Sequence, residues 1–544
     1  LLISAALFCG FTAILSAQNE RIELPDLTTV VSGNNQSEKA EAPELTDYTN
    51  LPLSIKPVAL EYTQEEVVYE PFVDEGFSDD DGLSYGKYGI QGQIGGGYPL
   101  NFYGDFSLNA GNDENPFNLS FLHNTIGSYG TYSPEDGYNF SDTKVGISQQ
   151  FVNGNASFKI SGMYDGLSNG LQGKSTNVSG IKQGLLNAGF DYVQKIPVKN
   201  KKIGLQTGAG ISGDLYNRYV DCPDSSTIST DWIKKSYIFS FEPYAFFNGN
   251  FGNFSTGLKA DYLVTIDCNK VLNTPMPLIP QQRLLNRGEI KLNAVYDSKN
   301  SWELKAVADA SVVFGSHLNE NKVLFPFTAG IESKYFDLKG GMESSATNIS
   351  SLERKNRFSA FSFIPSETSF WYGTFMLKLP LEKVSLNAGL TYKTTAFDNG
   401  VWEPDYSAVP VAEGVYQYTC GKKDYLNADF NAAFRYNDFD FGTSLKICFM
   451  DIAVLDADFY YDVFAKYTTR NKKWDLIADI NGVIGGEDAF PVMDFSSYYK
   501  ITSSVQAGVA VQDMLKLFTG STRTYAGQYV KESGNITLIV KFRG

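Results

Sequence analysis

The sequence predicts an all-β fold, a transmembrane antiparallel β-barrel of about 20–22 strands, an even number, with short periplasmic turns and long extracellular loops. Three observations support it. Long segments alternate apolar and polar residues, the composition is aromatic and weakly charged, and short connections alternate with long ones along the chain.

Alternation is clearest in 425–437. Leu426, Phe430 and Phe434 share one face, whereas Asp429 and Arg435 lie on the other. Because successive strand side chains point to opposite faces, this pattern gives one apolar and one polar surface. The same pattern recurs in 203–215, 302–314, 384–393, 457–467, 474–484 and the closing segment 536–542. Polar residues such as Asp429, Arg435 and Asp479 are expected to face the lumen.

Strand length distinguishes a membrane barrel from a soluble β-sandwich. The alternating segments run for about 10–14 residues, whereas globular strands average about 5–6. A tilted strand crosses the hydrocarbon layer in about 9–11 residues. A soluble β-propeller is the main soluble alternative, but it requires a blade repeat, and no signature residues recur.

The composition fits strands that face two solvents. Aromatic residues make up 14% of the 544-residue chain and charged residues 19%. The mean hydropathy is −0.20, so the apolar residues are dispersed among polar ones. Helical membrane proteins instead concentrate apolar residues in runs of about 20.

Two kinds of connection separate the alternating segments. Short polar turns are expected near 153 and at 197–200, 248–250, 297–300, 380–383, 437–438 and 471–473. Long segments rich in Gly, Ser, Asp and Pro are expected at 127–141, 165–180, 217–231, 269–287 and 397–423. Outer-membrane barrels have this layout, with turns in the periplasm and loops outside the cell.

The N-terminal region divides into two parts. Residues 1–17 resemble the apolar core and cleavage site of a signal peptide, and they predict export to a bacterial envelope. Residues 18–82 are polar, acidic and Pro-containing without a sustained period, as expected of an extended or disordered periplasmic arm. The barrel is predicted for 83–544. Asp79, Asp80 and Asp81 precede Gly82, but the spacing does not fit a calcium-binding loop.

No catalytic, cofactor-binding or metal-binding residue is predicted, no ligand-binding residue is assigned, and we expect that the chain is not an enzyme. The net charge of −16 argues against nucleic acid as a partner. Gly208–Gly213 matches GxGxxG but lies within an alternating segment without a following helix. The chain has only two histidines, of which His123 is expected on a strand and His317 in a loop, so a His-based catalytic triad is not expected.

Four cysteines follow the leader: Cys222, Cys268, Cys420 and Cys448. They lack the CxxC spacing of a zinc site. Cys222 and Cys268 both lie in segments that resemble loops, and two alternatives stay open for them. They form a disulfide in the oxidising periplasm, or all four remain free thiols.

The C-terminal segment 510–542 resembles the last two strands of TonB-dependent receptors. Asp513-Met514-Leu515 is similar to an element after the penultimate strand, and Tyr529, Gly534 and Phe542 match the loop and last strand. Leu24–Gly33 is similar in style to the TonB-contacting peptide, which implies contact with a TonB-type periplasmic protein through the arm. The chain departs from the family because only about 65 residues lie between the leader and the first predicted strand, whereas a folded plug needs roughly 130, so the plug is expected to be missing or reduced.

The leading functional hypothesis is passage or uptake of a solute across the bacterial outer membrane, with membrane lipid around the barrel. The alternative is a surface scaffold or adhesin that does not transport and whose extracellular loops bind a partner. Trp402, Tyr406, Tyr416 and Tyr418 in 397–423 motivate this alternative, because aromatic residues are enriched at binding surfaces.

Overall fold

The computed structural model describes the chain from residue 88 onward. Statements below concern residues 88–544 without 112–114, 130–131, 175–178, 200–202, 222–234, 269–283, 319–322, 362–364, 382, 398, 407–414, 437, 451–457, 485–490, 520–523, 526–528 and 532–533. The predicted signal peptide and periplasmic arm lie outside the described residues, so both stay predictions.

Twenty-two antiparallel strands form one closed barrel. Each strand pairs with the next along the barrel, and β1 closes the circle by pairing with β28, with Ile94 opposite Val540. The barrel strands are β1 (Tyr88–Tyr98), β2 (Asn101–Ala110), β3 (Phe117–Ile126), β4 (Phe140–Asn153), β5 (Ala156–Gly170), β6 (Gly180–Ile196), β7 (Ile203–Asp221), β8 (Lys235–Phe251), β9 (Phe254–Asp267), β10 (Leu284–Asp297), β11 (Lys305–Gly315), β13 (Phe327–Glu332), β14 (Phe336–Ser345), β16 (Thr368–Pro380), β17 (Val384–Thr395), β20 (Asp424–Tyr436), β21 (Phe439–Cys448), β22 (Phe459–Thr468), β23 (Trp474–Ile484), β24 (Val492–Lys500), β25 (Val505–Gln512) and β28 (Asn535–Arg543).

Short elements lie in the connections between barrel strands. They are η3 (Pro134–Asp136), β12 (Val323–Leu324), α3 (Ile349–Lys355), β15 (Ser359–Ala360), β18 (Val401–Pro404), β19 (Tyr416–Gly421), α4 (Met514–Thr519), β26 (Thr524–Tyr525) and β27 (Tyr529–Val530). Among the described residues, none of the helices has the length and apolar character needed to cross a bilayer.

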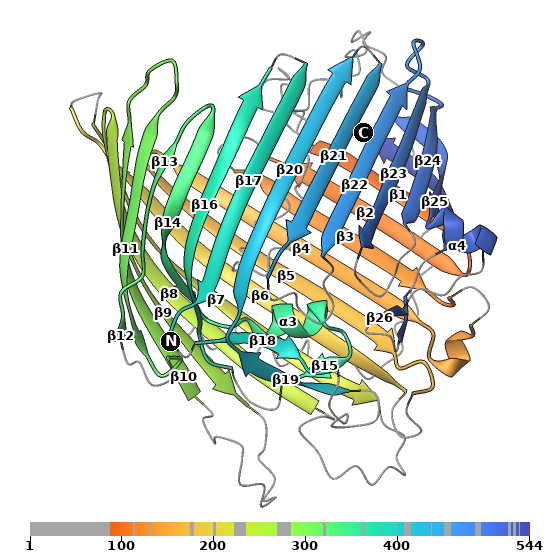
Figure 1. Ribbon diagram of the computed structural model, residues 1–544, viewed down its shortest axis with the longest axis horizontal. Helices are drawn as coiled ribbons and strands as arrows, with labels where there is room; N and C mark the ends of the chain where they lie inside the picture. Colours follow the sequence, from red (N-terminus) through yellow and green to blue (C-terminus); the bar gives the residue numbers. More distant parts are fainter. Residues whose placement is uncertain are drawn as a thin grey trace, which may run out of the picture. The chain divides into compact units, whose positions relative to one another are not determined.

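The two ends of the barrel differ in their connections. We call the end that carries the short connections, such as those after β4 and β8, the turn end; it lies at the top of Figure 1. The opposite end, which carries α3, β15, β18 and β19, is the loop end. The predicted division into short turns on one side and long loops on the other is confirmed.

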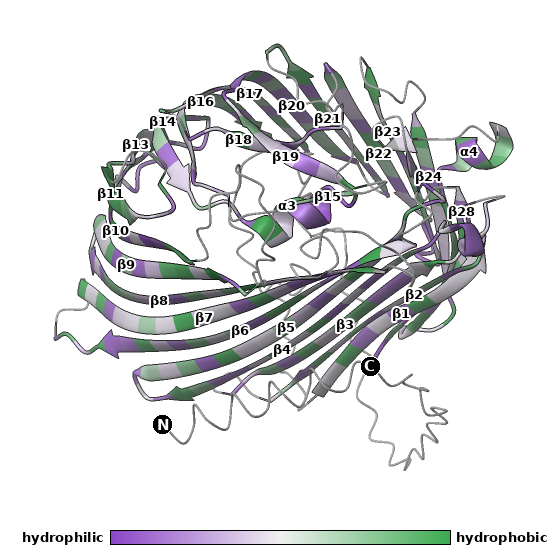
Figure 2. Cartoon of the chain, turned by 90° about the horizontal axis from the view of Figure 1, so that it is seen from below, coloured by the Kyte–Doolittle hydropathy of each residue, from purple (hydrophilic) through white to green (hydrophobic). Residues whose placement is uncertain are grey.

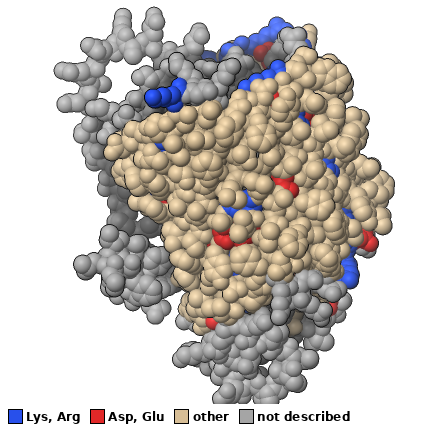
Figure 3. All heavy atoms as spheres, turned by 90° about the vertical axis from the view of Figure 1, so that its left-hand side faces the viewer, with Lys and Arg blue, Asp and Glu red and all other residues tan. Residues whose placement is uncertain are grey.

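The outward faces are apolar and the inward faces polar. On β20, Phe430 and Phe434 are exposed on the outside, whereas Asp429 and Arg435 lie on the lumen face, as predicted. Asp479 on β23 lies on the lumen face as well. One outward face carries few charged side chains (Figure 3).

Several predicted boundaries shift. Asn248–Asn250 belongs to β8, whose turn follows at 252–253, and Trp302 lies in the turn before β11. Segments assigned to loops, 165–170 and 217–221, extend β5 and β7. β7 therefore has 19 residues, more than the predicted length. Gly, Ser, Asn and Asp in these segments suggested loops, but the strands continue because lumen elements cover them.

The C-terminal residues that resemble TonB-dependent receptors have clear places. Asp513-Met514-Leu515 leads into α4, and Gly534 has a φ of +77°, a conformation that favours glycine. Phe542 lies in β28 against Gly92 of β1: a Cβ on Gly92 would be 2.8 Å from the Phe542 ring. This glycine therefore lets the closing strand pack against the first one.

Candidate functional site in the loop-filled lumen

The described parts of two long connections fold into the barrel rather than away from it. Loop L7, residues 346–367, carries α3 and β15, and loop L8, residues 396–423, carries β18 and β19. β19 pairs with both β15 and β18, so the two loops form one small sheet. Seen along the barrel, α3 and this sheet lie inside the ring of strands (Figure 2).

The helix α3 begins with a local capping interaction. Asn348 is the N-cap, and its side chain accepts a hydrogen bond of 3.0 Å from the backbone N–H of Ser351. The helix has only seven residues, too few to be stable alone in water. Its position therefore depends on contacts with the barrel wall.

A buried ion pair fixes α3 to the wall. Glu353 of α3 pairs with Arg218 of β7, and the two side chains are 0% and 1% exposed. The Glu353 carboxylate also accepts hydrogen bonds from the hydroxyl of Tyr216, at 2.5 Å, and from the backbone N–H of Phe361, at 2.7 Å. Because a buried charge is tolerated only when paired and hydrogen-bonded, this arrangement holds α3 in one place.

Two further arginine–carboxylate pairs attach L7 to the same wall. Arg354 pairs with Asp165 of β5 and donates a hydrogen bond of 2.9 Å to its backbone carbonyl. At the end of L7, Nε of Arg287 in β10 lies 3.2 Å from both oxygens of Glu367. Strands β5, β7 and β10 therefore each provide one anchor for L7.

Apolar and aromatic contacts fill the space between the anchors. Leu185, Tyr216, Ile238 and Leu285 of the wall form one buried cluster with four loop residues, Ile349, Phe361, Trp402 and Tyr418. The rings of Phe361 and Tyr418 stack at 3.8 Å between centroids. Their burial favours the folded-in position, because each removes a large apolar surface from water.

Tyr418 joins L8 to L7 by hydrogen bonds. Its hydroxyl donates to the backbone carbonyl of Leu352 at 2.8 Å and accepts from the Ser359 hydroxyl at 2.8 Å. The four aromatic residues proposed as a partner-binding surface, Trp402, Tyr406, Tyr416 and Tyr418, are 9%, 7%, 4% and 5% exposed. That interpretation of these residues was wrong, because they form the interior of the loop assembly.

A third connection reaches the same assembly from the other side of the barrel. Tyr529, in the connection before β28, stacks on Phe358 of L7 with 3.6 Å between centroids. Gln172, which follows β5, donates to the backbone carbonyl of Val530 at 2.8 Å and accepts from its N–H at 2.7 Å. Contacts between loops thus extend across the lumen.

A buried histidine lies where L7 returns to the barrel. His317 follows β11 in a turn, as predicted, and is 2% exposed; its backbone carbonyl accepts a hydrogen bond from the Glu367 N–H at 2.9 Å. Burial, together with the nearby charge of Arg287, lowers the pKa of His317 to about 4. Burial raises the pKa of Glu367, although Arg287 opposes this effect. His317 is therefore neutral at physiological pH.

Other residues singled out in the sequence have structural places. His123 lies on β3, as predicted, and shares a 2.8 Å hydrogen bond with Thr143 on β4. Gly208 and Gly210 lie within β7, which continues to Asp221, so they do not lead into a helix as the glycines of a dinucleotide-binding turn do. Among the described residues, no cluster of three or more His, Cys, Asp or Glu side chains is arranged to hold a metal ion.

The structure does not test the predicted alternative of a disulfide between Cys222 and Cys268. Among the described residues, Cys268, Cys420 and Cys448 form no disulfide with one another. Cys222, the candidate partner of Cys268, lies outside the described residues.

The arginine–carboxylate anchors were missed in the sequence. Arg218, Arg287, Glu353 and Glu367 lie far apart in the chain, and no spacing connects them. One signal was present: an arginine on the polar face of an alternating segment, as Arg218 is, needs a partner if the lumen is filled. The partner itself could not be named without the fold.

Solved structures with the same barrel are known. No model of a protein family and no curated protein matches the chain. The FrpB iron transporter from Neisseria meningitidis matches with a TM-score of 0.60 at 10% identity over 85% of this chain and 82% of that one. The fold is that of a TonB-dependent-receptor barrel.

Two further matches agree. The siderophore receptor PirA from Acinetobacter baumannii has a TM-score of 0.61 at 7% identity, covering 84% of this chain and 80% of that one. A mutant of the ferric enterobactin receptor PfeA from Pseudomonas aeruginosa has a TM-score of 0.60 at 7% identity, covering 85% and 82%. At these identities the likeness concerns the fold alone.

Proposed function

We propose that the chain is an outer-membrane barrel that passes a solute through a lumen gated by L7 and L8. The apolar outward face supports a lipid environment, because all backbone groups of a closed barrel are paired without water. The turn end then faces the periplasm and the loop end the cell exterior. The observation that carries the proposal is the three arginine–carboxylate anchors that hold L7 in the lumen.

Ion pairs suit a gate better than a permanent seal. Replacing a buried ion pair by apolar residues is often neutral or stabilising, so a permanent seal does not require charge. A charged anchor can be released when its partner is displaced or solvated. When the same two side chains pair again, L7 returns to the same position. The transporter and receptor names of the similar barrels support the same function.

Conductance in planar bilayers tests this proposal. We expect the full chain to be nearly silent and Glu353→Ala to conduct, because loss of the carboxylate leaves Arg218 buried and unpaired. A large, steady conductance of the unaltered chain would make it an open pore without a gate. Silence of both proteins, together with no solute uptake by vesicles that contain Glu353→Ala, contradicts passage altogether.

Energy coupling is a second part of the proposal. The likeness to TonB-dependent receptors and the style of Leu24–Gly33 support a contact between residues 18–82 and a TonB-type periplasmic protein. Pull-down of a purified TonB C-terminal domain by the full chain tests it. Equal capture by a variant in which Leu24–Gly33 is replaced by Gly-Ser repeats contradicts it.

A further inference from the structure

A row of amide side chains crosses the lumen wall near the turn end. In the pairing register, Lys195 of β6 is opposite Gln206 of β7, Gln206 is opposite Asn248 of β8, and Asn248 is opposite Gly257 of β9. Gly257 in turn is opposite Asn293 of β10. Neighbouring strands lie about 4.8 Å apart, so Lys195, Gln206 and Asn248 follow one another at that interval, and Gly257 lies between Asn248 and Asn293.

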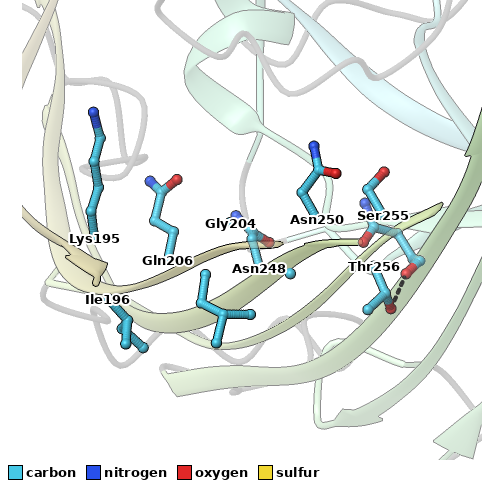
Figure 4. Close-up of a pocket in the computed structure, with 11 residues that line it drawn as sticks. Lys195, Ile196, Gly204, Gln206, Asn248, Asn250, Ser255 and Thr256 are labelled. Carbon is cyan, nitrogen blue, oxygen red and sulfur yellow. Dashed lines mark hydrogen bonds between the residues drawn. The ribbon is translucent and has the colours of Figure 1, made fainter. Parts of the chain in front are cut away.

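Four side chains of the row line a pocket of about 490 Å³ at the turn ends of β6–β10: Lys195, Gln206, Asn248 and Asn293. Lys195, Gln206 and Asn250 extend into it from the wall, whereas Ile196 points to the other side (Figure 4). None of the described residues that line the pocket is acidic, and Lys195 provides the single formal charge. Apart from Lys195, the pocket therefore offers neutral hydrogen-bond donors and acceptors.

Gly257 gives this row its concave shape. A Cβ at Gly257 would lie 2.4 Å from Oδ1 of Asn293 and 2.5 Å from Oδ1 of Asn248. The two amide groups therefore converge above the glycine from both neighbouring strands. A side chain at residue 257 would separate them.

An aromatic ring borders the row on its loop-end side. Phe246 lies two residues before Asn248 on β8, so both are on the lumen face. A Cβ on Gly208 of the paired strand would be 2.5 Å from the Phe246 ring, so the ring lies over this glycine. Tyr244 continues the aromatic strip, with 6.4 Å between the ring centroids, and Nζ of Lys259 lies 5.4 Å from the Tyr244 centroid.

We propose that this row binds a neutral oligosaccharide. An amide donates and accepts at once, which matches the adjacent hydroxyl groups of a sugar, and sugar C–H groups pack on the face of an aromatic ring. The interval of about 4.8 Å between strands is close to the length of one hexose unit. A polyanion fits poorly, since Arg and Lys clusters recognise such ligands. The inference extends the proposed function by naming a solute class.

Calorimetry on the purified full chain in detergent tests the proposal. The probes are maltohexaose, cellohexaose and mannohexaose, with hexaglycine as the peptide control. We expect at least one sugar to bind with a Kd of about 1 mM or tighter. Asn248→Leu and Phe246→Ala should each weaken binding of that sugar by at least about tenfold, since a lost hydrogen-bonding or stacking partner costs about 1.4 kcal/mol or more.

Two matched variants control for general effects on the barrel. Asn387→Leu removes a lumen-face amide from β17, and Phe247→Ala removes the ring next to Phe246 on the outward face. Both should bind the sugar as the unaltered chain does. Circular dichroism of each variant verifies that the barrel is folded.

Three outcomes overturn the proposal: no sugar in the panel binds, hexaglycine binds in place of the sugars, or the control variants weaken binding as much as Asn248→Leu does. Conductance does not enter this measurement. A barrel that binds the sugar, but for which Glu353→Ala neither conducts nor takes up solute, contradicts gated passage alone. A barrel that conducts without binding sugar contradicts only the inferred solute class.

Discussion

The wall formed by β6–β10 has two halves of different character. Toward the loop end, Arg218 and Arg287 are buried under L7 and paired with carboxylates. Toward the turn end, the same strands carry Gln206, Asn248 and Asn293, which are uncharged and line an open pocket whose single charged lining residue is Lys195; we call this part the neutral half. The charged half holds parts of the chain in place, whereas the neutral half leaves its hydrogen-bonding groups available to a ligand.

This difference follows from what each kind of side chain needs. An arginine in a dry interior requires a carboxylate, and that requirement selects one partner in one position. An amide side chain that is open to water can exchange a bound water molecule for a ligand at little cost in free energy, because water and ligand offer similar hydrogen bonds. The two halves therefore predict different responses to substitution.

The largest effect is expected for Glu353→Ala. Arg218 then remains buried without its carboxylate, which destabilises the folded-in position of L7 by about 3–5 kcal/mol. Trypsin should cleave after Arg354 or Lys355 much faster than in the unaltered chain. Glu332→Ala is the matched control, because its pair with Lys339 is partly exposed, at 32% and 36%. Equal cleavage of the two variants would show that the buried pair does not hold L7.

A pH dependence is expected for the turn at His317. Burial under L7 and the charge of Arg287 lower the pKa of His317 from 6.5 to about 4. His317 therefore binds a proton more strongly when this turn is open to water than when the turn is closed, that is, covered by L7. Closure therefore weakens as the pH falls from 6.5 to 4, by up to about 3 kcal/mol at 1.36 kcal/mol per pKa unit. Glu367 acts in the opposite direction, because its raised pKa favours closure on acidification.

The variant His317→Gln separates these two contributions. Hydrogen exchange at the Glu367 amide, which bonds the His317 carbonyl, is compared at pH 7 and pH 4.5 after correction for the intrinsic rate. The unaltered chain should lose protection at the lower pH and His317→Gln should not. If both lose protection equally, protonation of His317 does not open the turn.

Much of the barrel follows from the sequence. Alternation located β17, β20 and β23 nearly to the residue, because one face of each strand meets an apolar and the other a polar environment. The even strand number within about 20–22 is confirmed as 22. Local pattern suffices wherever a strand contacts only its neighbours and two solvents.

The interior does not follow from local pattern. Glu353 and Phe361 lie in a polar, loop-like segment, and their burial depends on a wall more than 130 residues away in the chain, as the separation of 135 between Arg218 and Glu353 shows. The aromatic residues of L8 had the composition of a binding surface but pack inward. Such contacts become visible only when the barrel brings opposite walls together.

A smaller effect is expected for Tyr418→Phe. The variant keeps the stacking on Phe361 but loses the hydrogen bonds to Leu352 and Ser359, so L8 should be destabilised on L7 by about 1–2 kcal/mol. The rate of trypsin cleavage after Lys422 reports this change. Cleavage that matches Glu353→Ala in rate would show that L8, rather than the ion pair, dominates closure.

The smallest effect on stability is expected for Gly257→Ala in the neutral half. The new methyl group would meet Oδ1 of Asn248 and of Asn293, and both are ends of side chains that can rotate into the open pocket. Because alanine also orders a strand better than glycine, the urea midpoint in detergent should change by less than the equivalent of about 0.5 kcal/mol. Gly208→Ala is the comparison, since its Cβ would lie 2.6 Å from the backbone oxygen of Tyr192, which cannot rotate away. A loss of stability at Gly257 as large as at Gly208 would mean that the amides are fixed in place like the charged half, and that the two halves of the wall do not differ as argued.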